Sequence, residues 1–260
     1  MYKITTFIIL GILAWTTQLQ AQEVREKTLD YKVDGGVYLD LALGNSITVK
    51  GWDKNKIYIK TTVEINGGRL NKALEMTYDK WGDQIRISSE LNQSILKTGK
   101  RGDCGDRYDR YQSVMNGRRY YACYSIEHEI YMPKNARLKL KAINPKVTLD
   151  NLYGDLRINT VNGSINMVTP QIKPKQNLEF RTVNGRIDFT IPASASTEVE
   201  MSTVNGHIYS SFKPKPKKKN GMYRIGGRRF NQNIRMRLGD GSAFTELKTV
   251  NGRIYLRKGK

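Results

Sequence analysis

The sequence predicts an all-β protein: a single-stranded parallel β-helix, or β-solenoid, built from repeats of about 21–23 residues. Three observations predict this fold: a recurring four-residue phrase, period-two alternation around it, and a corner within it. The phrase Thr-Val-Asn-Gly begins at residues 160, 182, 203 and 249, so successive copies start 22, 21 and 46 residues apart. A fixed period in the twenties is typical of stacked repeats, and the last gap is close to two periods.

The residues around each copy predict a strand, a corner and a second strand. Apolar residues alternate with polar ones before the first copy, at Leu156 and Ile158, and again after it, at Ile165 and Met167. The second pair has the opposite parity, so one face stays apolar only if the chain turns at Asn-Gly. Glycine tolerates the positive φ that such a corner often needs.

Two arrangements fit this unit: antiparallel hairpins, for which Asn-Gly is a strong signal, and successive coils of a solenoid. We favour the solenoid, because equivalent residues one coil apart would stack and their apolar side chains would fill a narrow core. The asparagines would then form an amide ladder at one corner, where they serve turn chemistry rather than ligand binding. The expected structural corners are Asn162, Gly163, Asn184, Gly185, Asn205, Gly206, Asn251 and Gly252.

Residues 1–21 are typical of a secretory signal peptide. Lys3 lies in a short n-region, an apolar stretch runs from Phe7 to Trp15, and a polar end precedes Gln22. The apolar stretch is too short to span a bilayer, and we expect no transmembrane span in the mature chain. We therefore expect export to the periplasm, the outer membrane or the cell exterior, with residues 22–36 as a lead-in and residues 37–260 as the solenoid domain.

The chain is strongly basic, with 44 Lys plus Arg against 24 Asp plus Glu and a formal net charge of +20. A field of this size attracts anionic polymers or membrane surfaces without specifying which. The predicted partners are therefore anionic polysaccharide, lipid headgroups or lipid A phosphates, with nucleic acid bound only non-specifically. Another envelope protein is the alternative partner.

Between residues 92 and 124 the alternation fails, and glycine, arginine and tyrosine take over, which predicts an insertion. The only two cysteines of the chain, Cys104 and Cys123, lie in it, and an even count in an exported chain favours a disulfide. Basic residues among tyrosines can grip sugars, phosphates or bases. The alternative is a disulfide-closed surface loop whose tyrosines pack on the solenoid wall. The candidate contact residues are Arg107, Tyr108, Arg110, Tyr111, Arg118 and Arg119.

The long interval between the third and fourth copies contains a basic loop over residues 211–229. Five lysines and five arginines, and no acid, lie between Ser211 and Arg237. Its prolines exclude the loop from a central strand. Two interpretations stay open: a solvated tip that keeps an exposed edge soluble, and an anion-binding site. The candidate anion-binding residues are Lys213, Lys215, Lys217, Lys218, Lys219, Arg228 and Arg229.

Several phrases together resemble the bacterial putative-adhesin family, a domain of unknown function with β-strand repeats. They are the run ITVKGWD at residues 47–53, the Met132-Pro133 strand end, Thr-Val-Asn-Gly followed by x-Ile, and residues 235–256 with their Gly-Asp-Gly. The resemblance covers roughly residues 37–256. It implies a single-stranded β-solenoid exported to the cell envelope, with an adhesive or scaffolding role and no accepted catalytic residues. The Arg/Tyr-rich insertion and the basic loop depart from the family, so the resemblance implies no binding role for them.

The favoured function is that of an exported, non-catalytic envelope or surface protein with an adhesive or scaffolding role, which binds anionic polymers or surfaces through its basic loops. The alternative is a protein-docking or signalling scaffold of the cell envelope. Its basis is four valines on the parity opposite to the core, which would form an outward apolar stripe or would reflect β-propensity alone: Val161, Val183, Val204 and Val250.

A polysaccharide-cleaving β-helix enzyme is the less favoured alternative. The only two histidines, His128 and His207, each fall within strand periodicity, and no nucleophile-elbow, zinc-protease or P-loop motif is present. Because these motifs are missing, we expect no catalytic residues, cofactor or metal. The enzyme alternative stays open, since carboxylates brought together by stacking would be distant in sequence and would leave no local motif.

Overall fold

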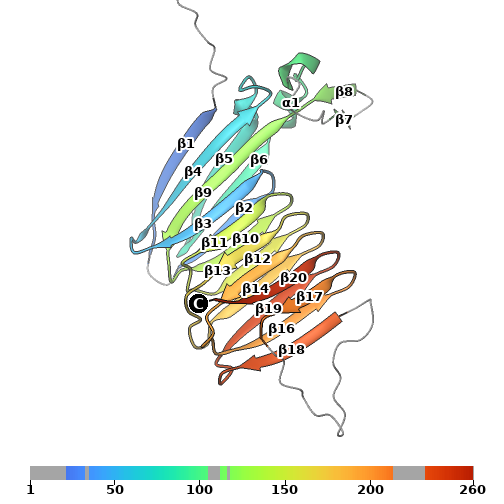
Figure 1. Cartoon of the computed structure of the whole chain (residues 1–260). Helices are drawn as coiled ribbons and strands as arrows, with labels where there is room; N and C mark the ends of the chain where they lie inside the picture. Colours follow the sequence, from blue (N-terminus) through green and yellow to red (C-terminus); the bar gives the residue numbers. More distant parts are fainter. Residues whose placement is uncertain (1–21, 33–34, 105–111, 116–117, 213–231, 260) are drawn as a thin grey trace, which may run out of the picture.

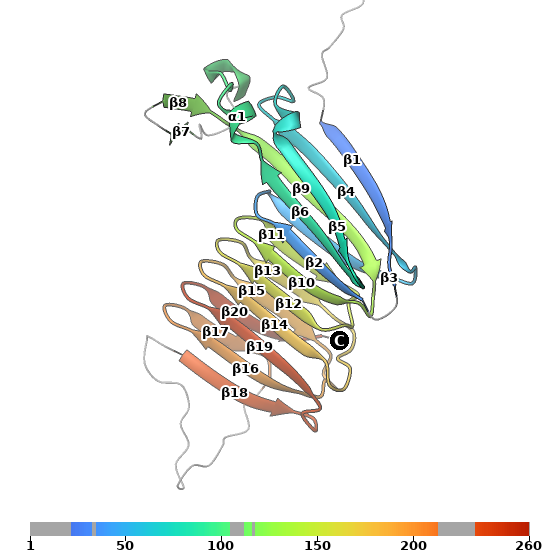
Figure 2. The same cartoon turned by 180° about the vertical axis from the view of Figure 1, so that it is seen from behind.

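The computed structural model describes residues 22–32, 35–104, 112–115, 118–212 and 232–259. The predicted signal peptide lies outside these residues. Two nine-stranded sheets enclose one long core, and Figure 1 and Figure 2 show their strands stacked from β1 and β5 at one end to β17 and β18 at the other.

The first sheet contains, in spatial order, β1 (Glu23–Asp30), β4 (Lys56–Ile65), β9 (Tyr124–Pro133), β3 (Ser46–Trp52), β11 (Lys146–Asp150), β13 (Ile165–Val168), β15 (Ile187–Ile191), β20 (Arg253–Lys258) and β17 (His207–Ser210). The second sheet contains β18 (Gln232–Leu238), β16 (Thr197–Thr203), β19 (Ala243–Thr249), β14 (Asn177–Thr182), β12 (Leu156–Thr160), β10 (Arg137–Ala142), β2 (Gly36–Leu41), β6 (Gln84–Leu91) and β5 (Leu74–Trp81). The other elements are η1 (Asn71–Ala73), α1 (Gln93–Leu96), η2 (Arg101–Cys104) and the hairpin of β7 (Gln112–Met115) and β8 (Arg118–Tyr121).

The chain is all-β, but the prediction of a single-stranded parallel β-helix is wrong. Both sheets are mixed: parallel pairs fill the middle, whereas β1–β4, β4–β9, β5–β6 and β16–β18 pair antiparallel at the ends. A chain that winds in one direction cannot produce antiparallel neighbours. Alternation has the same period in both kinds of strand, so the sequence pattern contains no information about strand direction.

Each Thr-Val-Asn-Gly copy joins a strand of the second sheet to a strand of the first, but the copies do not stack in sequence order. Thr182 of the second copy pairs with Thr249 of the fourth, and Thr249 pairs with Thr203 of the third. The fourth copy therefore lies between the second and the third. The chain reaches that place after β18, which runs antiparallel to β16.

The residues of the phrase have separate structural roles. In three of the four copies the buried threonine donates its hydroxyl to a glycine carbonyl of the neighbouring copy, as Thr182 does to Gly163 at 3.0 Å, whereas Thr160 donates to the Ile143 carbonyl at 3.2 Å. The valine points outward. The asparagine amide donates to the next asparagine, as Asn184 does to Asn162 at 2.8 Å. The complete amide ladder runs through Asn205, Asn251, Asn184, Asn162 and Asn144.

The corner glycines provide space, not the positive φ that the sequence pattern indicated. None of the four has a positive φ. A Cβ atom on Gly185 would lie 1.9 Å from the carbonyl oxygen of Gly163, and one on Gly163 would lie 2.0 Å from that of Pro145. No side chain fits at these distances, so the backbones of neighbouring copies are in contact at the corner.

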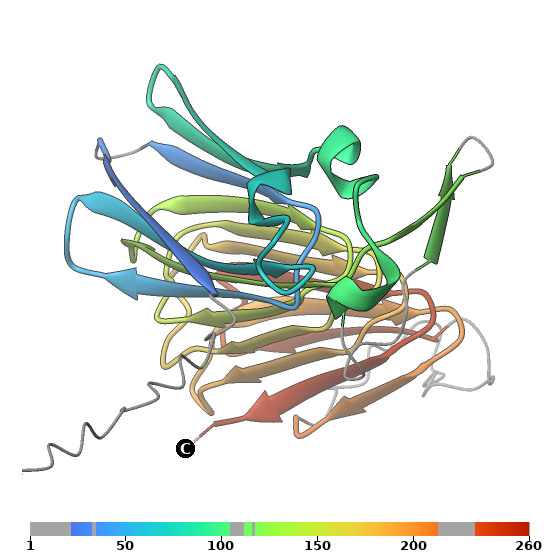
Figure 3. The ribbon, with the colours of Figure 1, turned by 90° about the horizontal axis from the view of Figure 1, so that it is seen from above.

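The core consists of the inward residues of both sheets. Phe180 and Phe189 are fully buried and meet edge to face, with ring centroids 5.3 Å apart. A smaller apolar cluster near the insertion includes Leu70, Leu74 and Leu96. Figure 3 shows the insertion, with α1 and the β7–β8 hairpin, projecting from the side of the stack.

Candidate functional site

A groove on the outer face of the second sheet gathers aromatic and basic side chains. The parallel strands β6, β2, β10 and β12 are in register, so one row across them contains Arg86, Tyr38, Lys139 and Arg157 in that order. Gly36 has no side chain and leaves space beside Tyr38. The resulting groove, named here the Tyr38 groove, has a volume of about 460 Å³.

Three cations surround the Tyr38 ring. The guanidinium carbon of Arg86 lies 5.1 Å from the ring centroid, and the Nζ atoms of Lys139 and Lys141 lie 5.3 and 5.8 Å from it. The ring quadrupole attracts cations at such distances. These contacts place three positive charges around one aromatic side chain.

Carboxylates neutralise only part of this charge. Asp40 Oδ2 accepts a hydrogen bond from the Tyr38 hydroxyl at 3.1 Å and another from Arg86 at 3.4 Å. Within the described residues, neither Lys139 nor Lys141 has a carboxylate within 4.0 Å. Both lysines are exposed, and Lys139 lines the groove, so the groove offers an anion in solution a cation that has no carboxylate partner in the described part of the chain.

Three glutamates continue the same row, and the first of them, Glu179, also lines the Tyr38 groove. Glu179 on β14, Glu246 on β19 and Glu200 on β16 are neighbours in register, although 67 residues separate the first two. Adjacent carboxylates are what glycoside hydrolases use as acid and nucleophile. The ion pairs and pKa shifts of these glutamates therefore bear directly on the enzyme hypothesis.

Each of these carboxylates is held by a basic side chain. The ion pairs are Arg157–Glu179 at 2.7 Å, Arg181–Glu246 at 2.6 Å and Arg235–Glu200 at 2.8 Å.

The pKa shifts disfavour a general-acid role for two of these glutamates, Glu179 and Glu200. Burial raises the pKa of the Glu179 carboxyl, but the hydrogen bond from Arg157 and further polar contacts outweigh it and leave the pKa below its ordinary value. Arg235 lowers the pKa of Glu200 in the same way. A general acid needs a raised pKa, so neither glutamate fits that role.

A ridge of branched apolar side chains lies beside the amide ladder. The backbone amide of Val183 donates to the Val161 carbonyl, and that of Val250 donates to the Val183 carbonyl, both at 3.2 Å. The side chains are between 38 and 43 % exposed. The valine ridge therefore consists of Ile143, Val161, Val183, Val250 and Val204, in spatial order.

The two predicted contact loops fall largely outside the described residues. This is so for Lys213, Lys215, Lys217, Lys218, Lys219, Arg228 and Arg229 of the basic loop, and for Arg107, Tyr108, Arg110 and Tyr111 of the insertion. Arg118 and Arg119 begin β8. A contact role for all of them stays a prediction.

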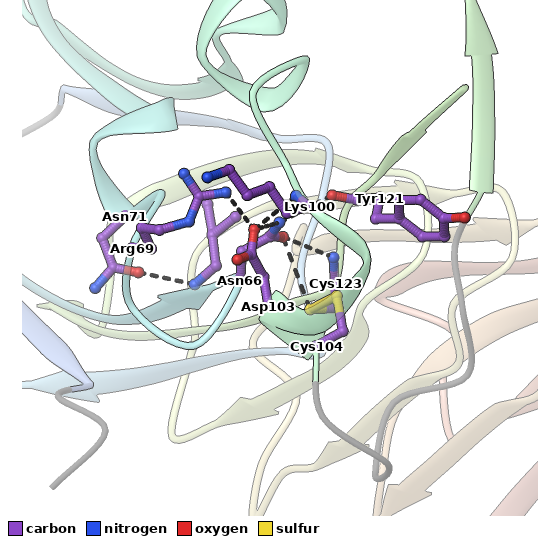
Figure 4. The surroundings of a disulfide bond; sticks show 9 residues. Asn66, Arg69, Asn71, Lys100, Asp103, Cys104, Tyr121 and Cys123 are labelled. Carbon is purple, nitrogen blue, oxygen red and sulfur yellow. Dashed lines mark hydrogen bonds and ion pairs between the residues drawn. A yellow bond between two sulfur atoms is a disulfide. The ribbon is translucent and has the colours of Figure 1, made fainter. Parts of the chain in front are cut away.

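The base of the insertion is joined to the turn after β4. Cys104 and Cys123 form a disulfide with their Cα atoms 5.8 Å apart, and Figure 4 shows Asn66 beside it. The Asn66 side chain donates to the Tyr121 carbonyl at 2.9 Å and accepts from the Cys123 amide at 3.0 Å. One asparagine thus bonds to the chain on both sides of Ala122.

Asp103 adds a second link to the same turn, as Figure 4 also shows. Its Oδ2 atom accepts from the Arg69 guanidinium and from the Lys100 amide, the latter at 2.7 Å. The hydrogen bond from Arg69 lowers the pKa of Asp103 to about 2. This carboxylate is therefore a structural anchor.

Sequence reasoning missed the Tyr38 groove. Tyr38, Lys139 and Lys141 each stand at outward positions of alternating strands, and this signal was present in the sequence. Their proximity depends on the pairing of β2 with β10, which are about 100 residues apart. The corner residues, in contrast, are marked by their own repetition.

The described residues contain no group of three or more His, Cys, Asp or Glu arranged to hold a metal ion. In the same part of the chain, no helix has the length and apolar character needed to cross a bilayer.

Comparison with known proteins gives a likeness of fold. No protein-family model and no curated protein matches the chain. Among solved structures, a putative cell adhesion protein from Clostridium sporogenes is 13% identical over 92% of this chain and 100% of its own, with a TM-score of 0.57.

Two further structures are less similar. A putative adhesin from Parabacteroides merdae is 10% identical over 91% of this chain and 97% of its own, with a TM-score of 0.30. A putative lipid binding protein from Parabacteroides distasonis is 12% identical over 90% of this chain and 97% of its own, with a TM-score of 0.20. At these identities the likeness to the Clostridium sporogenes protein concerns the fold alone.

Proposed function

We propose that this chain is an exported, non-catalytic surface protein with an adhesive or scaffolding role, and that it binds an anionic polymer in the Tyr38 groove. The observation that carries the proposal is the set of three cations around Tyr38, two of which have no carboxylate partner in the described part of the chain. The name of the Clostridium sporogenes protein supports an adhesive role. The sequence of residues 1–21 supports export.

The basic loop and the Arg/Tyr-rich insertion are proposed as additional contact surfaces. The net charge of +20 favours a negatively charged partner for each of these surfaces. Binding that is mainly electrostatic weakens steeply as the salt concentration rises. Association releases counterions from both partners, and this release is less favourable when the solution already contains more salt.

The test measures binding of the protein without residues 1–21 to polygalacturonate, lipopolysaccharide, anionic lipid vesicles and DNA, at low and high salt. One variant replaces Lys139 and Lys141 with serine. We expect it to bind about tenfold more weakly, because two exposed charge contacts together contribute about 1.4 kcal/mol. A control variant replaces Lys146 and Lys258, which lie on the other sheet outside the groove, and keeps its affinity.

A third variant replaces the five lysines of residues 213–219 with serine. Its loss of affinity gives the contribution of the basic loop to binding. Unchanged binding in the Lys139→Ser/Lys141→Ser variant would remove the Tyr38 groove from the proposal. Equal losses in all three variants would reduce the effect to net charge.

The valine ridge favours a second candidate function, the docking of another envelope protein. Its five side chains form one continuous apolar line, which is unlike single exposed valines on a soluble protein. Replacement of Val183 and Val250 by threonine keeps the β-branched shape and removes apolar surface. A solution mass that rises with concentration in the unaltered protein but not in this variant would show that the ridge docks a second copy of the chain, and would favour protein docking over polymer binding.

A further inference from the structure

A second groove adjoins the Tyr38 groove at Arg137. It lies at the edge of the stack opposite the valine ridge, where the chain passes from β3 to β4 and from β9 to β10, and its volume is also about 460 Å³. Its lining includes Trp52, Pro133 and Ala136. Arg137 lines both grooves. The name Trp52 groove is used below for this second groove.

The Trp52 groove repeats the pairing of aromatic and cationic side chains seen around Tyr38. Lys54 Nζ lies 5.1 Å from the Trp52 ring centroid, and Lys134 forms an ion pair with Asp53 at 2.5 Å. Near the rim, Lys173 Nζ donates to Asn135 Oδ1 at 2.7 Å. Within the described residues, neither Lys54 nor Lys173 has a carboxylate within 4.0 Å.

Both grooves combine apolar surface with a cationic rim. The Tyr38 ring lines the first groove, and Trp52 and Pro133 line the second. A sugar ring presents apolar C–H faces together with hydroxyls, and an acidic sugar adds one carboxylate per ring. The chemistry of the two grooves is complementary to both parts of such a ring.

Single-stranded nucleic acid fits this arrangement less well. Sequence-tolerant binding of bases needs open aromatic faces on which they stack. Here Lys139 and Lys141 stand within cation–π distance of Tyr38, and Lys54 within that of Trp52. A base that stacked on the same ring face would have to displace these cations.

We propose that the two grooves are adjoining subsites for one extended acidic polysaccharide, with Arg137 contacting the chain at the junction. The inference rests on the proposed function and adds the ligand class and the path. A glycan long enough to reach both subsites binds the second one intramolecularly, so its affinity exceeds that of a short fragment. A ligand of one or two sugars occupies a single subsite.

The test uses oligogalacturonates of two, four, six, eight and ten sugars with the protein lacking residues 1–21. We expect the affinity to rise about tenfold or more between two and eight sugars and then level off. Replacement of Lys54 and Lys134 with serine should lower the affinity for eight sugars about tenfold and leave that for two sugars within twofold. The control is again Lys146→Ser/Lys258→Ser.

The outcomes separate this inference from the proposed function. No binding of any oligogalacturonate, polymer or vesicle by the unaltered protein would contradict the proposed function. Binding that needs Lys139 and Lys141 but is independent of length and of Lys54 and Lys134 would overturn the two-subsite inference alone. Stronger binding of thymidine oligonucleotides than of oligogalacturonates with the same number of charges would overturn the ligand class.

Discussion

The side-chain amide of Asn205 donates a hydrogen bond to Oδ1 of Asn251 at 2.8 Å, although Asn251 belongs to the next copy in sequence, 46 residues later. Asn251 in turn donates to Asn184 of the second copy at 2.7 Å. The last copy therefore separates the second from the third. This order depends on β18, which reverses the chain before β19 joins the sheet.

Engineered disulfides test this order. Val183 and Val250 lie on neighbouring copies, whereas Val183 and Val204 are separated by one copy. Neighbouring strands lie about 4.8 Å apart, so the first pair is within disulfide reach and the second is beyond it. We expect Val183→Cys/Val250→Cys to cross-link under mild oxidation and Val183→Cys/Val204→Cys to stay reduced, as shown by mass spectrometry of peptides. Cross-linking of the second pair alone would contradict the order.

Gly185→Ala tests the contact between neighbouring corners. The new Cβ would lie 1.9 Å from the Gly163 carbonyl oxygen, so the copies must move apart. Overpacking of this kind costs about 1–3 kcal/mol, which we expect to measure as a lower free energy of unfolding in urea. Gly102→Ala is the control, because a Cβ there meets no atom of the described residues within 4 Å. Equal stability of the two variants would show that the corners can separate freely.

Buried His128 should make stability fall in mild acid. Burial lowers the pKa of His128 to about 4, and its Nδ1 atom lies 2.9 Å from Thr61 Oγ1. The unfolded chain binds a proton near the ordinary value of 6.5, so protons favour unfolding between pH 6.5 and about 4. We expect a loss of about 3 kcal/mol across this window, since one pKa unit corresponds to about 1.4 kcal/mol.

The measurement is the free energy of unfolding from pH 7 to pH 4. His128→Gln removes the titrating group and should flatten the curve in this window. His207→Gln changes the exposed histidine and should leave the slope as it was. A slope that persists in His128→Gln would assign the acid sensitivity to other groups.

The disulfide should stabilise the insertion and its junction with β4 and β9. Cys104 and Cys123 close a loop with a sequence separation of 19, for which chain entropy gives a contribution of about 3 kcal/mol. We expect Cys104→Ser/Cys123→Ser to unfold at lower temperature and to exchange amide hydrogens faster around Asn66. Faster exchange confined to the β18 region would contradict this assignment.

The corners show what sequence repetition can predict. Asn162 and Asn184 stack and bond because equivalent residues at a fixed spacing occupy equivalent places. The same alternation of apolar residues also describes β18, which runs antiparallel to β16. Periodicity therefore identified strands and corners, but strand direction and the order of the copies depend on tertiary pairing.

The candidate site shows the opposite case. Tyr38 and Lys139 are adjacent only because β2 and β10 pair with a particular register across a long sequence separation. Local composition predicted contact roles for residues 92–124 and 211–229, because charged residues are dense there. The Tyr38 groove has fewer charges, and its concentration of cations exists only in three dimensions.

The most direct measurement is hydrogen exchange of the protein lacking residues 1–21, with and without saturating polygalacturonate. The account predicts added protection in peptides that contain β2, β6 and β10, centred on Tyr38, Arg86 and Lys139, and continuing through residues 133–137. Protection confined to the valine ridge, or no change in β2 and β10 at saturation, would contradict the assignment of the anionic polymer to the Tyr38 groove.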